Sequence, residues 1–62
     1  MQIDRDFLHK LDRIATKVWL VECTLDNADL VQTTIRNALY RARIEINTAE
    51  HLAKVHLGLR EV

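Results

Sequence analysis

The sequence predicts an all-α protein, an antiparallel hairpin of two helices, and three observations lead to this fold class. The 62 residues include one glycine and no proline, so β-hairpin turns and glycine-rich phosphate loops have almost nothing to build them. Apolar side chains recur at alternating steps of four and three, which is the a/d pattern of packed helices. Near residue 26, helix-disfavouring side chains interrupt that pattern. We expect one domain, residues 1–62.

The first helix is expected over about residues 4–25. Its apolar seam, meaning the row of a and d positions, consists of Phe7, Leu11, Ile14, Val18, Val21 and Leu25. Leu8 and Ala15 widen this seam on one flank. A seam wider than strict a/d is typical of a helical bundle rather than of a two-stranded coiled coil.

A chain reversal is expected at about residues 26–28. Asp26, Asn27 and Asp29 follow one another closely there, and their side chains compete for backbone hydrogen bonds. Asp26, with Asp29 three residues later, can also cap the start of a following helix. The sequence therefore predicts that the chain folds back on itself at this point.

The second helix is expected over about residues 28–57, with Gly58 as its C-terminal cap. Its part of the apolar seam consists of Ile35, Leu39, Ala42, Ile46, Ala49 and Ala53. Asn47, followed by Glu50 three residues later, could instead cap a separate third helix. A kink near Asn47 is the alternative for this region.

The small size of the chain predicts self-association. A domain of about 60 residues buries only about 60% of the surface of its unfolded chain, and a two-helix hairpin leaves one side of its apolar stripe uncovered. A second copy would cover that side. We therefore expect a homodimer that forms a four-helix bundle.

The chemistry that an enzyme needs is poorly represented. Serine is absent, Cys23 is the only thiol, and His9, His51 and His56 are not spaced as metal ligands. No two carboxylates are expected side by side in the apolar seam, where they could form a tuned acid–base pair. The sequence predicts no catalytic activity, no metal and no cofactor.

The location is expected to be cytoplasmic. The longest run of bulky apolar residues is only Val18–Val21, far below the roughly 18 residues of a membrane span. A single cysteine cannot form an internal disulfide, and this favours a reducing compartment. We expect a soluble protein without membrane contact.

Charge is unevenly distributed along a chain whose net charge is zero. The first thirty residues carry four basic and six acidic side chains, and the remainder carries five basic and three acidic ones. A hairpin that binds RNA or DNA could use Arg36, Tyr40, Arg41 and Arg43 on the second helix. The favoured interpretation is a solvated face that forms ion pairs with the acidic first helix.

An apolar surplus lies outside the seam and suggests a docking surface for a partner protein. It consists of Trp19, Leu20, Cys23 and Leu30, with Tyr40 and Ile44 as a smaller pair on the second helix. Aromatic anchors dominate protein interfaces, so Trp19 would be the centre of this surface if it stays exposed. The alternative is that the dimer interface covers these residues.

Two heptad arms joined by the short acidic turn Leu25-Asp26-Asn27-Ala28-Asp29-Leu30 resemble Rop-type hairpins, which dimerise into four-helix bundles and bind paired RNA loops. The chain departs from them on its acidic first helix, because the RNA-binding face of those hairpins lies on the first helices. The format is also similar to small phage-encoded hairpins, including quorum-sensing anti-activators that dock on transcription regulators. Neither resemblance identifies functional residues.

Together these features predict a homodimeric interaction protein, such as a phage or plasmid accessory factor. It would bind and inhibit or modulate a host protein, for example a transcription regulator. An RNA- or DNA-binding hairpin is the first alternative. A coiled-coil assembly or chaperone subunit that pairs with a different chain is the second.

Overall fold

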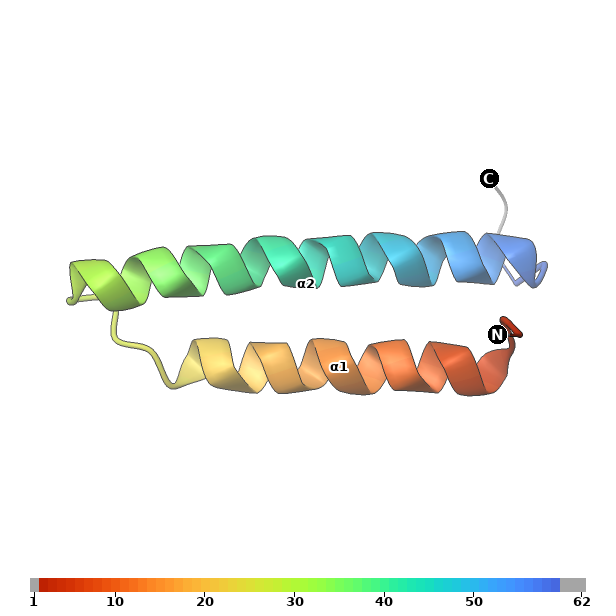
Figure 1. Cartoon of the computed structure of the whole chain (residues 1–62), viewed down its shortest axis with the longest axis horizontal. Helices are drawn as coiled ribbons and strands as arrows, with labels where there is room; N and C mark the ends of the chain where they lie inside the picture. The colour runs from red at the N-terminus through yellow and green to blue at the C-terminus, as the bar shows by residue number, and fades with distance from the viewer. Residues whose placement is uncertain (1, 60–62) are drawn as a thin grey trace.

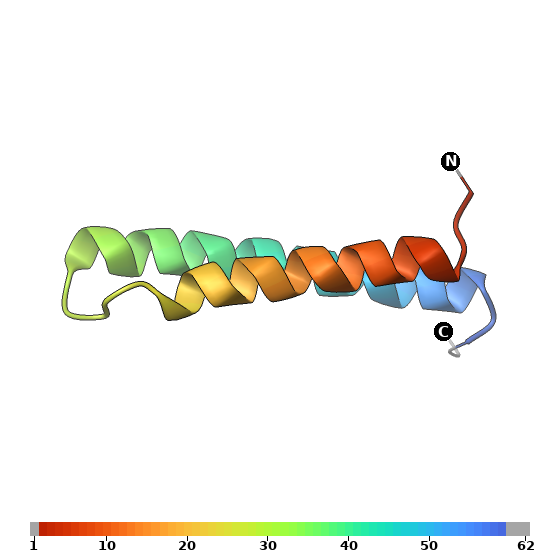
Figure 2. The same cartoon turned by 90° about the horizontal axis from the view of Figure 1, so that it is seen from below.

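A computed structural model describes residues 2–59 and confirms an all-α hairpin. Helix α1 (Arg5–Cys23) and helix α2 (Leu30–His56) lie side by side in antiparallel directions, as Figures 1 and 2 show. The start of α1 and the end of α2 lie at one end and the connecting loop at the other, in a particle of 43 × 21 × 16 Å. Within the described residues, neither helix combines the length and the hydropathy needed to cross a membrane.

Helix α1 is shorter than the predicted span of 4–25. It begins at Arg5 because the Asp4 carboxylate caps it, accepting a hydrogen bond of 2.9 Å from the Phe7 amide. It ends at Cys23, where the Thr24 hydroxyl donates to the Val21 carbonyl at 2.7 Å.

The loop spans residues 24–29, longer than the predicted turn of 26–28, and side-chain hydrogen bonds hold it. The Asp26 amide donates to the Gln32 side chain at 2.7 Å, and its carboxylate accepts from the Ala28 amide at 2.9 Å. The Thr33 hydroxyl donates to the Asn27 carbonyl at 3.0 Å. The loop is longer than expected because these polar groups bond to one another instead of continuing the helix.

Helix α2 begins at Leu30, where Asp29 caps the Gln32 amide at 3.0 Å as the sequence suggests. At its other end Gly58 adopts a φ of 75°, and its amide donates to the Val55 carbonyl. The Leu59 amide donates to the Lys54 carbonyl at 2.8 Å, which completes a Schellman motif. The predicted glycine cap is confirmed.

The alternative of a third helix from Asn47 is wrong, because α2 runs without interruption through this residue. The Thr48 hydroxyl donates back to the Ile44 carbonyl at 3.1 Å, a bond made inside a continuing helix. Glu50 does not reach back to cap Asn47, because it pairs with Lys54 at 2.9 Å.

Only part of the predicted apolar seam lies between the two helices. Its more buried members are Phe7, Leu11 and Val18 on α1, Leu25 in the loop, and Leu39, Ile46 and Ala53 on α2. Ala53, at 4% exposure, is the one buried apolar residue among residues 2–59. The remaining seam residues are exposed, since a contact between two helices covers only one side of so wide a stripe.

Candidate interaction surfaces

A partly buried ion pair joins the last turn of α1 to the middle of α2. Arg43 Nε donates to Glu22 Oε2 at 2.7 Å, and Arg43 Nη2 donates to Glu22 Oε1 at 3.3 Å. Glu22 is only 4% exposed. The fork of the guanidinium matches both carboxylate oxygens, which is the geometry that makes a buried carboxylate tolerable.

Sequence reasoning did not place a charge at this contact. The available signal was the row of Leu8, Ala15 and Glu22, which recur every seven residues beside the seam. Arg43 occupies the equivalent flank on α2 and has the opposite charge. The structure confirms in this pair the expected ion pairing between the second helix and the acidic first helix.

Arg43 also contacts an aromatic ring. Its guanidinium carbon lies 5.3 Å from the centre of the Tyr40 ring, within cation–π distance. Hydrogen bonding to Glu22 raises the pKa of the Arg43 guanidinium above its ordinary value, and the charges of Tyr40 and Cys23 add to this effect. Arg43 is therefore a fixed cation that holds Glu22 and Tyr40 on one side of the hairpin.

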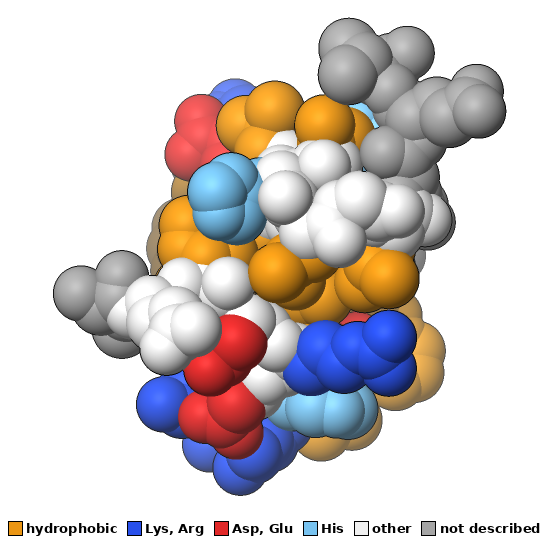
Figure 3. Space-filling model, turned by 90° about the vertical axis from the view of Figure 1, so that its right-hand side faces the viewer, with side chains coloured by type: hydrophobic (Ala, Val, Ile, Leu, Met, Phe, Trp, Pro, Cys, Tyr) orange, Lys and Arg blue, Asp and Glu red, His pale blue; other side chains and the backbone are white. Residues whose placement is uncertain are grey.

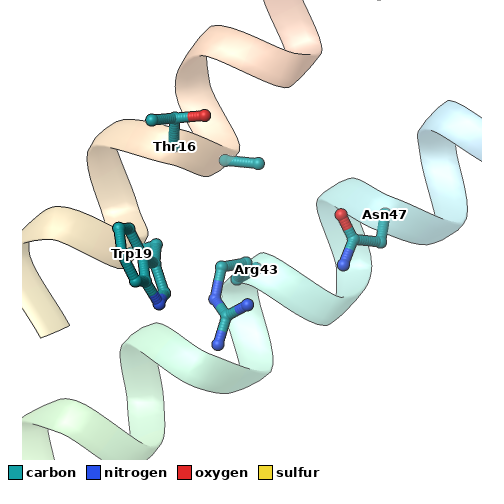
Figure 4. A pocket seen from close by; sticks show the side chains of 5 residues that line it. Thr16, Trp19, Arg43 and Asn47 are labelled. Atoms are coloured by element: carbon teal, nitrogen blue, oxygen red, sulfur yellow. The ribbon is translucent and has the colours of Figure 1, made fainter. Parts of the chain in front are cut away.

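Trp19 lies beside this pair at the edge of a groove that both helices form. The groove has a volume of about 310 Å³ and is lined by Ala15, Thr16, Trp19, Arg43 and Asn47. Figure 4 shows Trp19 approaching from α1 and Arg43 and Asn47 from α2. Trp19 remains 49% exposed.

The docking residues predicted from the sequence occupy different parts of the hairpin. Trp19 and Cys23 are four residues apart and share one side of α1, where both are exposed. Leu20, 52% exposed, lies about 100° further round the helix from Trp19. Leu30 starts α2 and is 81% exposed, about 15 Å along the helix from Tyr40.

The tyrosine that was grouped with the arginines belongs instead with Trp19. Tyr40 is 49% exposed, and both Tyr40 and Cys23 lie close enough to Arg43 to contribute to raising the pKa of its guanidinium. We call Trp19, Cys23, Tyr40 and Asn47, arranged around Arg43, the Trp19 surface. It gathers aromatic rings, a thiol and an amide from both helices.

The arginines proposed for nucleic-acid binding do not form one stripe. Arg43 binds Glu22, and Arg36 donates to the Asn27 side chain in the loop. Arg41 is exposed and follows Tyr40 by one residue, so it projects about 100° away from that ring. Two of the three guanidinium groups therefore already have partners within the hairpin.

An exposed apolar face covers the other side of the hairpin. We call it the apolar face and define it by the exposed seam residues Ile14, Val21, Ile35, Ala42 and Ala49. Ile14, Val21 and Ile35 are between 47% and 50% exposed. In the view onto the end with the termini, hydrophobic side chains continue from between the helices to the surface (Figure 3).

The apolar face continues into a groove at the open end of the hairpin. This groove has a volume of about 310 Å³ and is lined mostly by apolar side chains, namely Ile3, Phe7, Ala49, Leu52, Ala53 and His56. His56 contributes the polar ring of this set. The exposed apolar surface thus runs along most of the molecule.

Among residues 2–59, no three His, Cys, Asp or Glu side chains lie close enough together to hold a metal ion. No protein-family model matches the chain, and no curated protein or solved structure matches it either.

Proposed function

We propose that the protein is a non-enzymatic interaction protein that acts as a homodimer and docks a partner protein through the Trp19 surface. The observation that carries this proposal is the half-exposed Trp19 beside a groove formed by both helices. The open apolar face supports the homodimer, because a soluble monomer seldom leaves so long an apolar stripe uncovered.

The chemistry of the Trp19 surface fits a protein partner. Tryptophan, tyrosine and arginine are the residues that most often contribute large binding energies at protein interfaces. Arg43 is held by Glu22 and lies over Tyr40, so little side-chain freedom remains to be lost on binding.

A nucleic-acid partner is less well supported. Binding to a nucleic acid requires cationic side chains that displace small counterions from its phosphate backbone. Arg36 and Arg43 already have partners within the hairpin. The net charge of the chain is zero. We therefore favour a protein target and take a transcription regulator, the kind of target of the phage hairpins that this chain resembles, as the first class to test.

The partner interaction can be followed with Trp19, which is the only tryptophan of the chain. We expect a purified partner, first captured from lysate of the native host, to shift Trp19 fluorescence to shorter wavelength and to shield it from iodide. Trp19→Ala should weaken binding at least about 30-fold, corresponding to about 2 kcal/mol. Leu20→Ala, a truncation of a similarly exposed apolar side chain that lies outside the Trp19 surface and outside the apolar face, is the matched control.

Two results would contradict this proposal. One is partner capture by folded Trp19→Ala that equals capture by the unaltered chain. The other is a salt-sensitive gel shift with RNA or DNA that Arg36→Ala and Arg43→Ala weaken, which would favour the nucleic-acid alternative. A chain that stays monomeric until a different helical protein is added would indicate an assembly subunit instead.

A further inference from the structure

The apolar face is bordered by opposite charges on its two outer edges. On α1, the row of Ile14 and Val21 is flanked by half-buried Val18 toward α2 and by exposed Lys17 on the side away from α2. On α2, the row of Ala42 and Ala49 is flanked in the same way by Ile46 and Glu45. Lys17 and Glu45 therefore mark the two edges.

The two edge charges lie at the same level along the hairpin. Thr16 and Asn47 line one groove, so their neighbours Lys17 and Glu45 are within one helical turn of each other along the long axis. They are separated across the width of the apolar face. Each edge thus presents one charge to a neighbouring molecule at a matching height.

The shape of the face suits a second copy of the same chain. Thr16 and Asn47 line one groove, so Ile14 and Ala49, two residues away on each helix, lie at about the same level, and Val21 and Ala42 are each one heptad further toward the loop. Each level pairs a branched side chain with an alanine. Two such faces can interdigitate, since branched residues of one copy find space beside the alanines of the other.

Two symmetric arrangements bring these faces together. With the two-fold axis parallel to the helices, α1 lies beside α2 of the second copy and both loops are at one end. With the axis perpendicular to them, α1 lies beside α1 of the second copy and the loops are at opposite ends. Packing of branched residues beside alanines is possible in both arrangements, so the charges along the edges of the apolar face distinguish them.

We propose that a second copy covers the apolar face with α1 beside its α2 and with both loops at the same end. In this arrangement Lys17 of each copy meets Glu45 of the other, which gives two opposite-charge contacts. In the perpendicular arrangement the two α1 edges run along each other and the two α2 edges do the same, so Lys17 and Glu45 do not meet. This inference rests on the homodimer of the proposed function.

Charge reversal tests the arrangement by sedimentation equilibrium at low salt. Lys17→Glu and Glu45→Lys should each weaken the dimer about 10-fold, because each replaces two attractive contacts per dimer by two repulsive ones. The double variant should recover to within about 3-fold of the unaltered chain. Arg13→Glu, an equal charge change on the exposed outward side of α1, is the matched control and should have little effect.

A distance measurement provides a second test that does not depend on charge. A spin label on Leu30→Cys, in a chain with Cys23→Ala, lies near the loop. Loops at one end place the two labels less than about 30 Å apart, which is set by the width of a four-helix bundle. Loops at opposite ends place them more than about 35 Å apart, which is set by the rise along the helices.

The outcomes separate this inference from the proposed function. A dimer in which the charge reversals match Arg13→Glu, or in which the labels are more than about 35 Å apart, overturns the arrangement and leaves the homodimer in place. A chain that stays monomeric at every concentration overturns both.

Discussion

At the scale of single residues, the contact between Glu22 and Arg43 explains how a charge is accommodated between the helices. A buried carboxylate without a partner would be strongly destabilising, and the bidentate guanidinium offsets that desolvation. Because the pKa of Arg43 is raised on folding, the stability that its cation contributes is lost at high pH only as the pH rises above the ordinary arginine value. The pair therefore keeps its cation throughout the physiological range.

We expect Arg43→Ala to lower the urea midpoint of unfolding more than Arg41→Ala does, since only the former leaves Glu22 buried without a cation. Replacing both members of the pair, with Glu22→Leu and Arg43→Leu, should restore most of the loss. Circular dichroism at a fixed protein concentration measures all of these variants. Equal midpoints for the two single arginine variants would show that the pair does not stabilise the fold.

Trp19 and Leu20 illustrate how neighbouring residues on one helix acquire different surroundings. Both are about half exposed, but Trp19 borders the groove with Arg43 whereas Leu20 lies further round α1. The sequence predicts Trp19 as the centre of a docking surface. Tyr40 lies on the same side of the hairpin because of the way α2 is rotated about its axis relative to α1. The residue pattern of either helix alone does not predict this rotation.

At the scale of the helices, local capping signals account for where α1 and α2 begin and end. Asp29 and Gly58 were recognised in the sequence and act as caps in the structure. Asp4 also caps α1 but had been placed within the expected helix. The loop came out longer than predicted, because it depends on bonds from Gln32 and Thr33, which belong to the following helix.

Gly58→Ala should destabilise the protein by about 1 kcal/mol, because its φ of 75° is unfavourable for a residue with a Cβ. No atom lies within 4 Å of that Cβ, so the effect is conformational rather than steric. Gly58→Asn should lose less, since asparagine tolerates this region better. Urea unfolding gives the comparison, and an alanine variant as stable as the unaltered chain would contradict the role of the cap.

Asp29→Ala should cost about 1 kcal/mol by removing the hydrogen bond to the Gln32 amide. Asp29→Asn keeps an oxygen acceptor at the same place and should retain most of the stability. If asparagine and alanine were equally destabilising at this position in urea unfolding, the charge rather than the hydrogen bond would be the stabilising feature.

At the scale of the whole molecule, the hairpin has two dissimilar sides. The Trp19 surface combines aromatic rings with a fixed ion pair, whereas the apolar face lacks comparable polar contacts. In the proposed dimer the apolar faces meet at the centre, and the two Trp19 surfaces point outward at the same height. Self-association and partner binding would then not compete for the same residues.

Val21 and Leu20 offer a direct test of self-association, because they are adjacent and equally exposed in the hairpin, at 50% and 52%. Val21→Asp should convert the dimer to a monomer and lower the thermal midpoint, since it places a charge in the apolar face. Leu20→Asp should leave the dimer intact. The midpoint of the unaltered chain should also rise with protein concentration, and identical behaviour of the two aspartate variants would exclude this interface.

The sequence by itself determined the two helices, a reversal near residues 26–28 and most of the caps, because these depend on residues a few positions apart. Only the tertiary structure decided which part of the apolar seam lies between the helices and which part forms the apolar face. A stripe wider than one helix contact allows several rotations of α2 against α1. Glu22 and Arg43 are 21 residues apart in the chain, and their bidentate contact forms in the rotation of α2 against α1 that the structure adopts.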